Sequence, residues 1–176
     1  MDFFRFLLFP VALLYGIVIF FRNLLYDIGI LPTKEFETAV IVIGNLSAGG
    51  TGKSPMTEYL IHLLKDKFSI AILSRGYKRH TNGFMIADTN SSSFQIGDEP
   101  LQFKKKFPDV MVTVDENRKH GIQKLLSQFP DLKVLLLDDA FQHRRVKPGL
   151  SILLSDYGKM FYDDFLLPAG TLREWR

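Results

Sequence analysis

An apolar, β-branched run followed by a glycine-rich turn and an amphipathic segment constrains the fold of this chain more than any other feature. Residues 39–46 read AVIVIGNL, which is typical of a central strand covered on both faces. Residues 47–54 read SAGGTGKS, and residues 54–68 carry apolar side chains at helical spacing. This order predicts a loop whose backbone N–H groups converge on phosphate oxygens at a helix N-terminus. We therefore expect a P-loop that holds a nucleoside triphosphate.

Each residue type in this loop has a physical role. Lys53 is expected to reach the β- and γ-phosphates, and the hydroxyl of Ser54 can ligate Mg²⁺. The strict pattern has glycine where this chain has Ser47, but the remaining residues keep the strand-to-helix setting. An ordinary glycine-rich turn is the alternative. The predicted nucleotide-binding residues of the loop are Ser47, Ala48, Gly49, Gly50, Thr51, Gly52, Lys53 and Ser54.

A second apolar run, residues 132–137, ends on the paired acids Asp138 and Asp139. An acid at the carboxyl end of a strand near a P-loop can hold Mg²⁺ directly or through water, as a Walker B acid does. Adjacent side chains point differently, so at most one of the two acids is expected to face the metal. Asp138 is taken as the metal ligand, but the sequence leaves open which of the two acids faces the metal and which serves loop structure or substrate positioning.

A third candidate is Asp98, in the sequence GDEP at residues 97–100, where a helix is predicted to begin. A carboxylate there could accept the proton of an attacking hydroxyl. Helix capping is the alternative role for Asp98. Arginines are further phosphate candidates because their planar fork matches phosphate oxygens, although surface placement is expected for any single one. These are Arg75, Arg79, Arg118, Arg144, Arg145 and Arg173.

After residue 32, short strands alternate with helical segments, which is typical of a parallel α/β sheet. We therefore predict an α/β fold, a mostly parallel P-loop NTPase-type sheet flanked by helices, with the strand order left open. The strands are expected at residues 39–46, 69–73, 110–114, 132–137 and 150–154, with a short edge strand at 84–87. The helices are expected at residues 54–68, 97–107 and 116–129.

The N-terminus forms a separate predicted unit, residues 1–31, ahead of a P-loop domain at residues 32–176. Residues 6–21 carry no charge, and as a helix they would cover about 24 Å of a hydrocarbon core of about 30 Å. Apolar flanking residues favour a tilted or shallow membrane-associated helix, kinked at its start by Pro10. A signal peptide is one alternative, although no small-residue cleavage site follows the run. A buried core helix is the other.

Composition excludes several kinds of site. The chain has no cysteine, which removes disulfides, thiol nucleophiles and zinc fingers, and fits a reducing compartment. The net charge of +3 is spread out, so no nucleic acid partner is expected, and no protein partner is predicted either. His120 and His143 belong to no metal-binding pattern. Metal-assisted phosphoryl transfer is the chemistry that the motifs support.

Two other functional classes remain as alternatives. A membrane-associated P-loop ATPase or nucleotide switch would act on a protein partner, but Ala48 stands where partitioning ATPases carry a signature lysine. The guanine-reading sequence Asn-Lys-x-Asp is also absent from the sequence. A membrane-anchored module that only binds nucleotide would have no need of Asp98 near a P-loop.

Five segments carry a specific combination of motifs: residues 44–55 (GNLSAGGTGKSP), 73–77 (LSRGY), 97–100 (GDEP), 138–145 (DDAFQHRR) and 168–174 (PAGTLRE). Taken in this order, they resemble the tetraacyldisaccharide 4'-kinase family of lipid A biosynthesis, which makes residues 32–176 a P-loop kinase domain. The resemblance implies transfer of the ATP γ-phosphate to the 4'-hydroxyl of an acylated glucosamine disaccharide lipid. It places this reaction at the membrane surface, on the cytoplasmic face of the inner membrane, with ATP as co-substrate and Mg²⁺ as cofactor.

The resemblance also implies roles for single residues. Asp98 becomes the base acting on the sugar hydroxyl, and Lys53, Asp138 and Asp139 join it as catalytic residues. Arg173 joins the nucleotide site, and Glu174 joins Ser54 and Asp138 at the metal. Family members are about twice as long as this chain, and a histidine in their C-terminal portion pairs with the base. We therefore expect this chain to correspond to the N-terminal half of a member.

Overall fold

In the computed structural model, which describes residues 3–158 and 160–175, six strands form one sheet in the order β3-β4-β2-β5-β1-β6. Every neighbouring pair is parallel except β3 with β4, which is antiparallel. The prediction of a mostly parallel α/β sheet is confirmed. The strands are β1 (Ala39–Asn45), β2 (Ile70–Ser74), β3 (Met85–Ile86), β4 (Met111–Val114), β5 (Val134–Asp138) and β6 (Leu150–Leu154).

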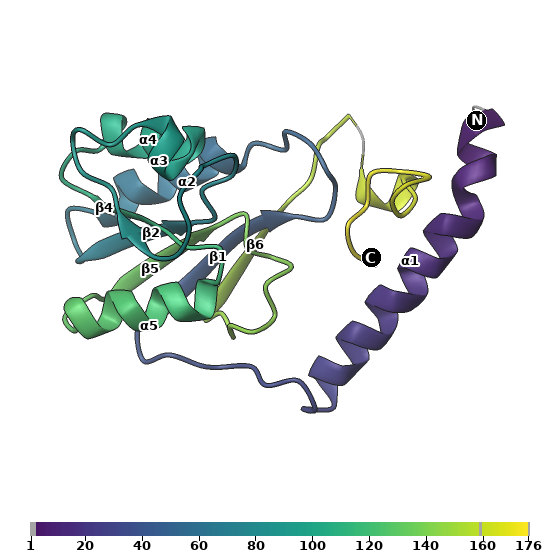
Figure 1. The fold of residues 1–176 in the computed structure, drawn as a ribbon, viewed down its shortest axis with the longest axis horizontal. Helices are drawn as coiled ribbons and strands as arrows, with labels where there is room; N and C mark the ends of the chain where they lie inside the picture. Colours follow the sequence, from purple (N-terminus) through teal and green to yellow (C-terminus); the bar gives the residue numbers. More distant parts are fainter. Residues whose placement is uncertain (1–2, 159, 176) are drawn as a thin grey trace.

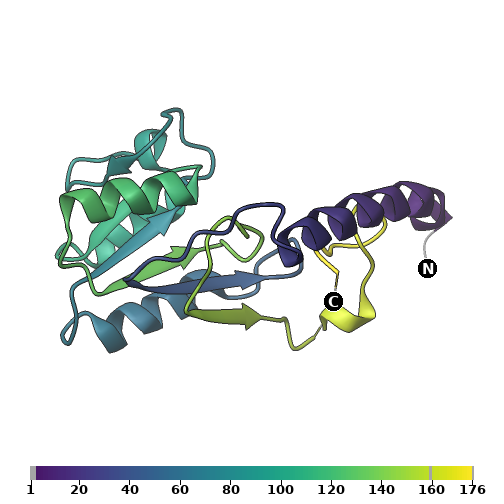
Figure 2. The ribbon, with the colours of Figure 1, turned by 90° about the horizontal axis from the view of Figure 1, so that it is seen from below.

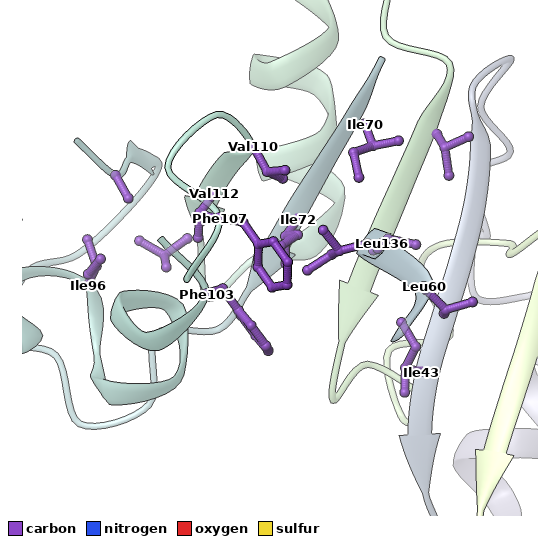
Figure 3. Packing of buried hydrophobic residues seen from close by; sticks show 14 residues of the cluster. Ile43, Leu60, Ile70, Ile72, Ile96, Phe103, Phe107, Val110, Val112 and Leu136 are labelled. Atoms are coloured by element: carbon purple, nitrogen blue, oxygen red, sulfur yellow. The ribbon is translucent and has the colours of Figure 1, made fainter. Parts of the chain in front are cut away.

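Helices cover both faces of the sheet (Figure 1). On one face lie α2 (Lys53–Leu64), α3 (Ser93–Ile96) and α4 (Asp98–Lys106), and on the other lies α5 (Arg118–Gln128). Figure 3 shows the first interface, where Phe103 of α4 and Ile72 and Leu136 of the sheet are fully buried. Ile122 of α5 is fully buried on the opposite face. Burial on both faces explains why the central strands read as nearly continuous apolar runs.

The strand register brings the ends of three strands to one edge of the sheet. β5 lies between β1 and β2, with Ile43 opposite Asp138 and Leu73 opposite Leu137. Because the strands are parallel, the loop after β1, the end of β2 and the acids after β5 meet at the carboxyl edge. Ligands of open α/β sheets bind at this edge.

Local boundaries differ from the predictions in a few places. The predicted helix at 54–68 ends at Leu64, and the short helix α3 was not predicted. A reciprocal capping box between Ser92 and Gln95 begins α3 within a polar stretch. Gly97 occupies the N-cap position of α4 and Asp98 is its first helical residue, so the capping role considered for Asp98 is wrong.

The N-terminal helix α1 (Phe3–Asp27) lies apart from the sheet and continues through Pro10 (Figures 1 and 2). It packs against residues 164–175, which we term the strap, with Gly16 next to Trp175 and the ring of Phe9 against Phe165. Among the described residues, α1 is the one helix long and apolar enough to cross a membrane, and residues 7–27 have a mean hydropathy of 2.0. Only 17% of its most apolar stretch is buried among the described residues, so α1 does not belong to the core of the sheet, and its membrane association stays a prediction.

Candidate functional site

The P-loop joins β1 to α2 through a glycine in the left-handed region. Gly52 has φ 83° and is the N-cap residue of α2, and it offers no side chain to cap the helix. This conformation favours glycine because it has no Cβ. The first N–H groups of α2 are therefore available to an anion, and the positive end of the helix dipole favours negative charge there.

Asn45, the last residue of β1, forms hydrogen bonds with the P-loop. Its side chain is fully buried, and Nδ2 donates to Oγ1 of Thr51 at 2.8 Å and to the carbonyl of Gly49 at 3.4 Å. The backbone carbonyl of Asn45 accepts a hydrogen bond from Nε2 of Gln142 at 2.9 Å. These bonds fix both sides of the loop to the end of β1, so the protein itself maintains the shape of the loop.

The two P-loop residues with functional side chains contact acids. Nζ of Lys53 lies 3.6 Å from Oδ1 of Asp139 and 3.5 Å from the carbonyl of Gly49. Oγ of Ser54 lies 3.4 Å from Oε1 of Glu99, in the first turn of α4. The P-loop is therefore linked both to the end of β5 and to the helix that begins with Asp98.

Asp138 is almost fully buried at the end of β5. Its carboxylate accepts hydrogen bonds from Thr57 of α2 and from Ser74 of β2, each at 3.4 Å. Burial raises the pKa of Asp138 to about 6, and the nearby charges of Glu99 and Asp139 act in the same direction. The positive charges of Arg118 and Lys53 oppose this shift. Asp138 is thus a carboxylate whose charged form would gain strongly from an additional cation nearby.

Asp139 points differently from its neighbour. Its backbone is in the left-handed region with φ 45°, a conformation that Asp tolerates better than most residues. Its carboxylate contacts Lys53 and also Nη1 of Arg173, at 3.2 Å. The two adjacent acids therefore have separate environments: one is buried among hydroxyls, and the other joins the P-loop lysine to the strap.

A cleft of about 750 Å³ opens beside these residues at the carboxyl edge of the sheet. It brings together four of the predicted site residues, Asp98, Lys53, Asp139 and Arg173. Asp98 is exposed at the start of α4, so its carboxylate is accessible from the cleft. The remaining lining residues are Tyr15, Arg22, Ser74, Arg75, Tyr77, Lys78, Glu99, Arg118, Gln142, His143 and Leu167.

Glu174 is not brought to this cleft. Its buried carboxylate forms an ion pair with Arg22 and accepts a hydrogen bond from Nδ2 of Asn23 at 3.0 Å, both from α1. The metal-binding role of Glu174 therefore stays a prediction. Within residues 3–158 and 160–175, no three His, Cys, Asp or Glu side chains form a metal-binding cluster. Mg²⁺ beside a nucleotide needs only one or two protein oxygens, and the hydroxyl of Ser54 and the carboxylate of Asp138 are suitable donors.

Several residues that line the cleft were not predicted from the sequence, or were predicted to lie on the surface. Surface placement was expected for Arg118, but its side chain is 2% exposed and donates to the backbone carbonyls of Asp115 and Asp138. Burial lowers the pKa of His143 to about 4, so this cleft residue is neutral at physiological pH. Tyr15 reaches the cleft from α1. These placements depend on long-range packing, and no local pattern marks them.

Comparison with known proteins gives a consistent assignment. The family model described as tetraacyldisaccharide-1-P 4'-kinase matches residues 4–176. A tetraacyldisaccharide 4'-kinase of Bacteroides thetaiotaomicron is 60% identical over 95% of this chain and 44% of the relative. That of Flavobacterium johnsoniae is 56% identical over 100% of this chain and 52% of the relative.

A solved structure agrees with the sequence relatives. The crystal structure of LpxK from Aquifex aeolicus in complex with ATP superposes with a TM-score of 0.89 at 42% identity. The match covers 98% of this chain and 55% of that chain. The chain thus spans about half the length of the relatives that it matches. The P-loop, the acids after β5 and this extended similarity agree, and the chain belongs to the tetraacyldisaccharide-1-P 4'-kinase family.

Proposed function

We propose that the protein transfers the γ-phosphate of ATP to the 4'-hydroxyl of a tetraacyldisaccharide 1-phosphate, a step of lipid A biosynthesis. The observation that carries the proposal is the shared cleft of Lys53 and Asp98 at the carboxyl edge of the sheet. The amine of Lys53 and the exposed carboxylate of Asp98 line one surface, which supports a site where a bound phosphate meets a base. The family membership and the related structure in complex with ATP support the choice of reaction.

The nucleotide is held by the P-loop in this proposal. Backbone N–H groups at the start of α2 bind its phosphates, and Lys53 neutralises charge on the β- and γ-phosphates. The contact of Lys53 with Asp139 at 3.6 Å keeps the amine directed along the loop. Arg173, held by the same acid, offers a second cation at the cleft. Positioned cations of this kind stabilise the charge of a transferring phosphoryl group.

The acceptor is activated by Asp98. Its carboxylate accepts the proton of the sugar hydroxyl while the hydroxyl oxygen attacks the γ-phosphorus. The bond between that phosphorus and the β–γ bridging oxygen breaks, and ADP leaves with the electron pair. Because Asp98 is exposed on the first turn of α4, a bulky lipid sugar can approach it from outside the protein.

Mg²⁺ would be held by the hydroxyl of Ser54 and the carboxylate of Asp138. When bound, it would neutralise charge on the β- and γ-phosphate oxygens. Burial and the nearby charges of Glu99 and Asp139 raise the pKa of Asp138, so its ionised form is unfavourable without a counter-charge. A bound cation would supply that charge. The donor set contains only hard oxygen ligands, which suit Mg²⁺ better than a transition metal.

The membrane surface is the proposed place of the reaction, at the cytoplasmic face of the inner membrane. The outward face of α1 is lined by large apolar side chains, which include Leu14 at 64% and Val18 at 66% exposure. Immersing such a face in the interface gains about 1.5–3 kcal/mol for each fully buried side chain. Since Tyr15 and Arg22 of the same helix line the cleft, the catalytic surface lies beside the membrane-seeking one.

The test is transfer of radiolabelled γ-phosphate from ATP to tetraacyldisaccharide 1-phosphate in mixed micelles, with the natural protein that contains this sequence. We expect labelled lipid with the wild type and at least a hundredfold less with Asp98→Asn. Asp66→Asn, at an exposed acid after α2, is the matched control and should transfer normally. ATP hydrolysis without labelled lipid in the wild type would refute the kinase proposal. Equal transfer by Asp98→Asn would refute only the role of that residue.

A further inference from the structure

The strap lies between the P-loop and α1. On its P-loop side, the N–H of Arg173 donates to the carbonyl of Leu46 at 2.7 Å, and the N–H of Ala48 donates to the carbonyl of Thr171 at 2.6 Å. Ser47 and Leu172 form an antiparallel bridge between these bonds. The strap is therefore paired directly with the first residues of the phosphate-binding loop.

The other side of the strap is held by α1. The hydroxyl of Tyr15 donates to the carbonyl of Arg173 at 3.1 Å, and Nε1 of Trp175 donates to the carbonyl of Gly16 at 2.8 Å. Glu174 is held by Arg22 and Asn23 of the same helix. Three consecutive strap residues are thus fixed by one helix. The side chain of the first of them, Arg173, extends in turn to Asp139 in the cleft.

Close approach of the strap depends on Gly16. A Cβ at this position would lie 2.5 Å from Cζ2 of Trp175 and 2.8 Å from Cδ1 of Leu166. Real Cβ atoms do not tolerate such distances, and both neighbours belong to the strap. Gly16 costs the helix about 1 kcal/mol relative to alanine, so its presence in the middle of α1 is unfavourable for the helix alone. The contact with Trp175 supplies a reason for it.

We infer that Tyr15, Gly16 and Trp175 are positioning residues for the nucleotide site, so that α1 sets the reach of Arg173 to Asp139 in addition to seeking the membrane. The inference rests on the proposed function only in that Arg173 acts on bound ATP. A hydrogen bond weakens steeply with distance and angle, so a displacement of about 1 Å in the strap would remove the contact between Arg173 and Asp139. The membrane helix therefore forms one wall of the nucleotide site.

Gly16→Ala tests the inference because it improves helix propensity while it displaces the strap. The full chain is assayed in detergent micelles without lipid substrate, by competition of ATP with a fluorescent ATP analogue. We expect the Kd for ATP to rise about tenfold in Gly16→Ala and about threefold in Tyr15→Phe. In the transfer reaction, the KM for ATP should rise more than kcat falls. Val18→Ala, on the exposed face of the same helix, should bind ATP as the wild type does.

Trp175 is the only tryptophan among residues 1–176, so its emission reports on the contact directly once any tryptophan outside this range is replaced by phenylalanine. Its emission should shift to longer wavelength in Gly16→Ala, with an unchanged thermal unfolding midpoint showing that the sheet remains folded. An unshifted emission would overturn the proposed contact. A shifted emission with a wild-type Kd for ATP would overturn the positioning role.

The result is separable from the test of kinase activity. If the wild type binds ATP but phosphorylates no lipid, the proposed function is refuted. The comparison of Kd values among the variants would still decide whether α1 positions the nucleotide site. Equal rises in Kd for Gly16→Ala and Val18→Ala would also overturn it, because the effect would then belong to α1 as a whole.

Discussion

Nη1 of Arg173 lies 3.2 Å from Oδ2 of Asp139, so the strap reaches the same carboxylate that contacts the P-loop lysine. Both side chains are about 30% exposed, which leaves them accessible to a ligand in the cleft. The pair joins three parts of the chain that are distant in sequence: the P-loop, the end of β5 and the strap.

Replacing Arg173 by lysine tests the geometry of this pair. Lysine keeps the charge but loses the planar fork of arginine, which is suited to binding the Asp139 carboxylate and the proposed phosphate together. We expect kcat/KM for ATP to fall about tenfold, which corresponds to about 1.4 kcal/mol. Steady-state kinetics would measure this, with Arg145→Lys at an exposed position as the matched control. An equal effect in both variants would contradict the prediction.

Asp138→Asn should stabilise the protein while it abolishes transfer. The folded pKa of Asp138 is raised from 3.8 to about 6, so its stabilising contribution is present below pH 3.8 and is lost as the pH rises through 6. At pH 8 the buried charge costs on the order of 3 kcal/mol. Thermal unfolding without nucleotide should show a gain of about 1–3 kcal/mol at pH 8 that shrinks toward pH 4.

The matched control for this stability measurement is Asp66→Asn, whose carboxylate is 77% exposed. It should unfold like the wild type at both pH values, since an exposed acid keeps its hydration. A stability gain in Asp138→Asn that was independent of pH would show that packing, and not the buried charge, is responsible.

The rate of transfer should fall in acid with a midpoint near pH 6. Asp138 must be ionised to ligate a metal, and it takes up a proton as the pH drops below its pKa of about 6. In the profile of kcat/KM, which reports on the free enzyme, activity should decrease about tenfold for each unit below the midpoint. His143→Gln should leave the midpoint in place because the pKa of His143 is about 4. A midpoint moved by that variant would assign the titration to the histidine.

Gly52→Ala should destabilise the loop through its backbone alone. The left-handed conformation at φ 83° costs an L-residue about 1–2 kcal/mol, and no atom lies within 4 Å of the added Cβ. Gly50 has equally open surroundings without that conformation, which makes Gly50→Ala a matched comparison. Thermal unfolding in the absence of nucleotide should separate the two variants by about 1–2 kcal/mol. Similar midpoints would show that the unliganded loop relaxes around alanine.

The outward face of α1 should govern membrane binding. The side chains of Leu14 and Val18 are each more than 60% exposed on this face. Replacing both by aspartate places two charges there. We expect vesicle binding, measured by sedimentation, to fall more than tenfold, since burying an unpaired charge in hydrocarbon is costly. Phe68→Asp, at an exposed apolar residue after α2, should bind vesicles normally. Undiminished binding of the double variant would contradict the role of this face.

Local signals allowed much of the fold to be predicted. A local pattern marks the strand at 39–46, the P-loop and the apolar run that ends on Asp138. In the structure, the P-loop and Asp138 meet at the carboxyl edge of the parallel sheet. Helix ends were less accurate because fraying and capping depend on single residues, as the capping box of Ser92 shows.

The rest depends on contacts that a local pattern cannot reveal. The left-handed backbone of Asp139 directs its carboxylate toward Lys53, but the sequence gives no sign of that conformation. Arg118 reads as a surface residue and is nevertheless buried, because its guanidinium satisfies the carbonyls of Asp115 and Asp138. Both features arise from segments that meet only in the folded protein.

The order of the strands also determines when the site can form. β1 leaves the ribosome early, but Ala39 pairs with Val134 of β5 and Ile41 pairs with Leu150 of β6. Such distant pairing is slow, because a long loop must close before any contact is gained. The strap, which completes the surroundings of Lys53, is synthesised later still. A nascent chain therefore contains the whole of α1 well before the P-loop and its surroundings can assemble.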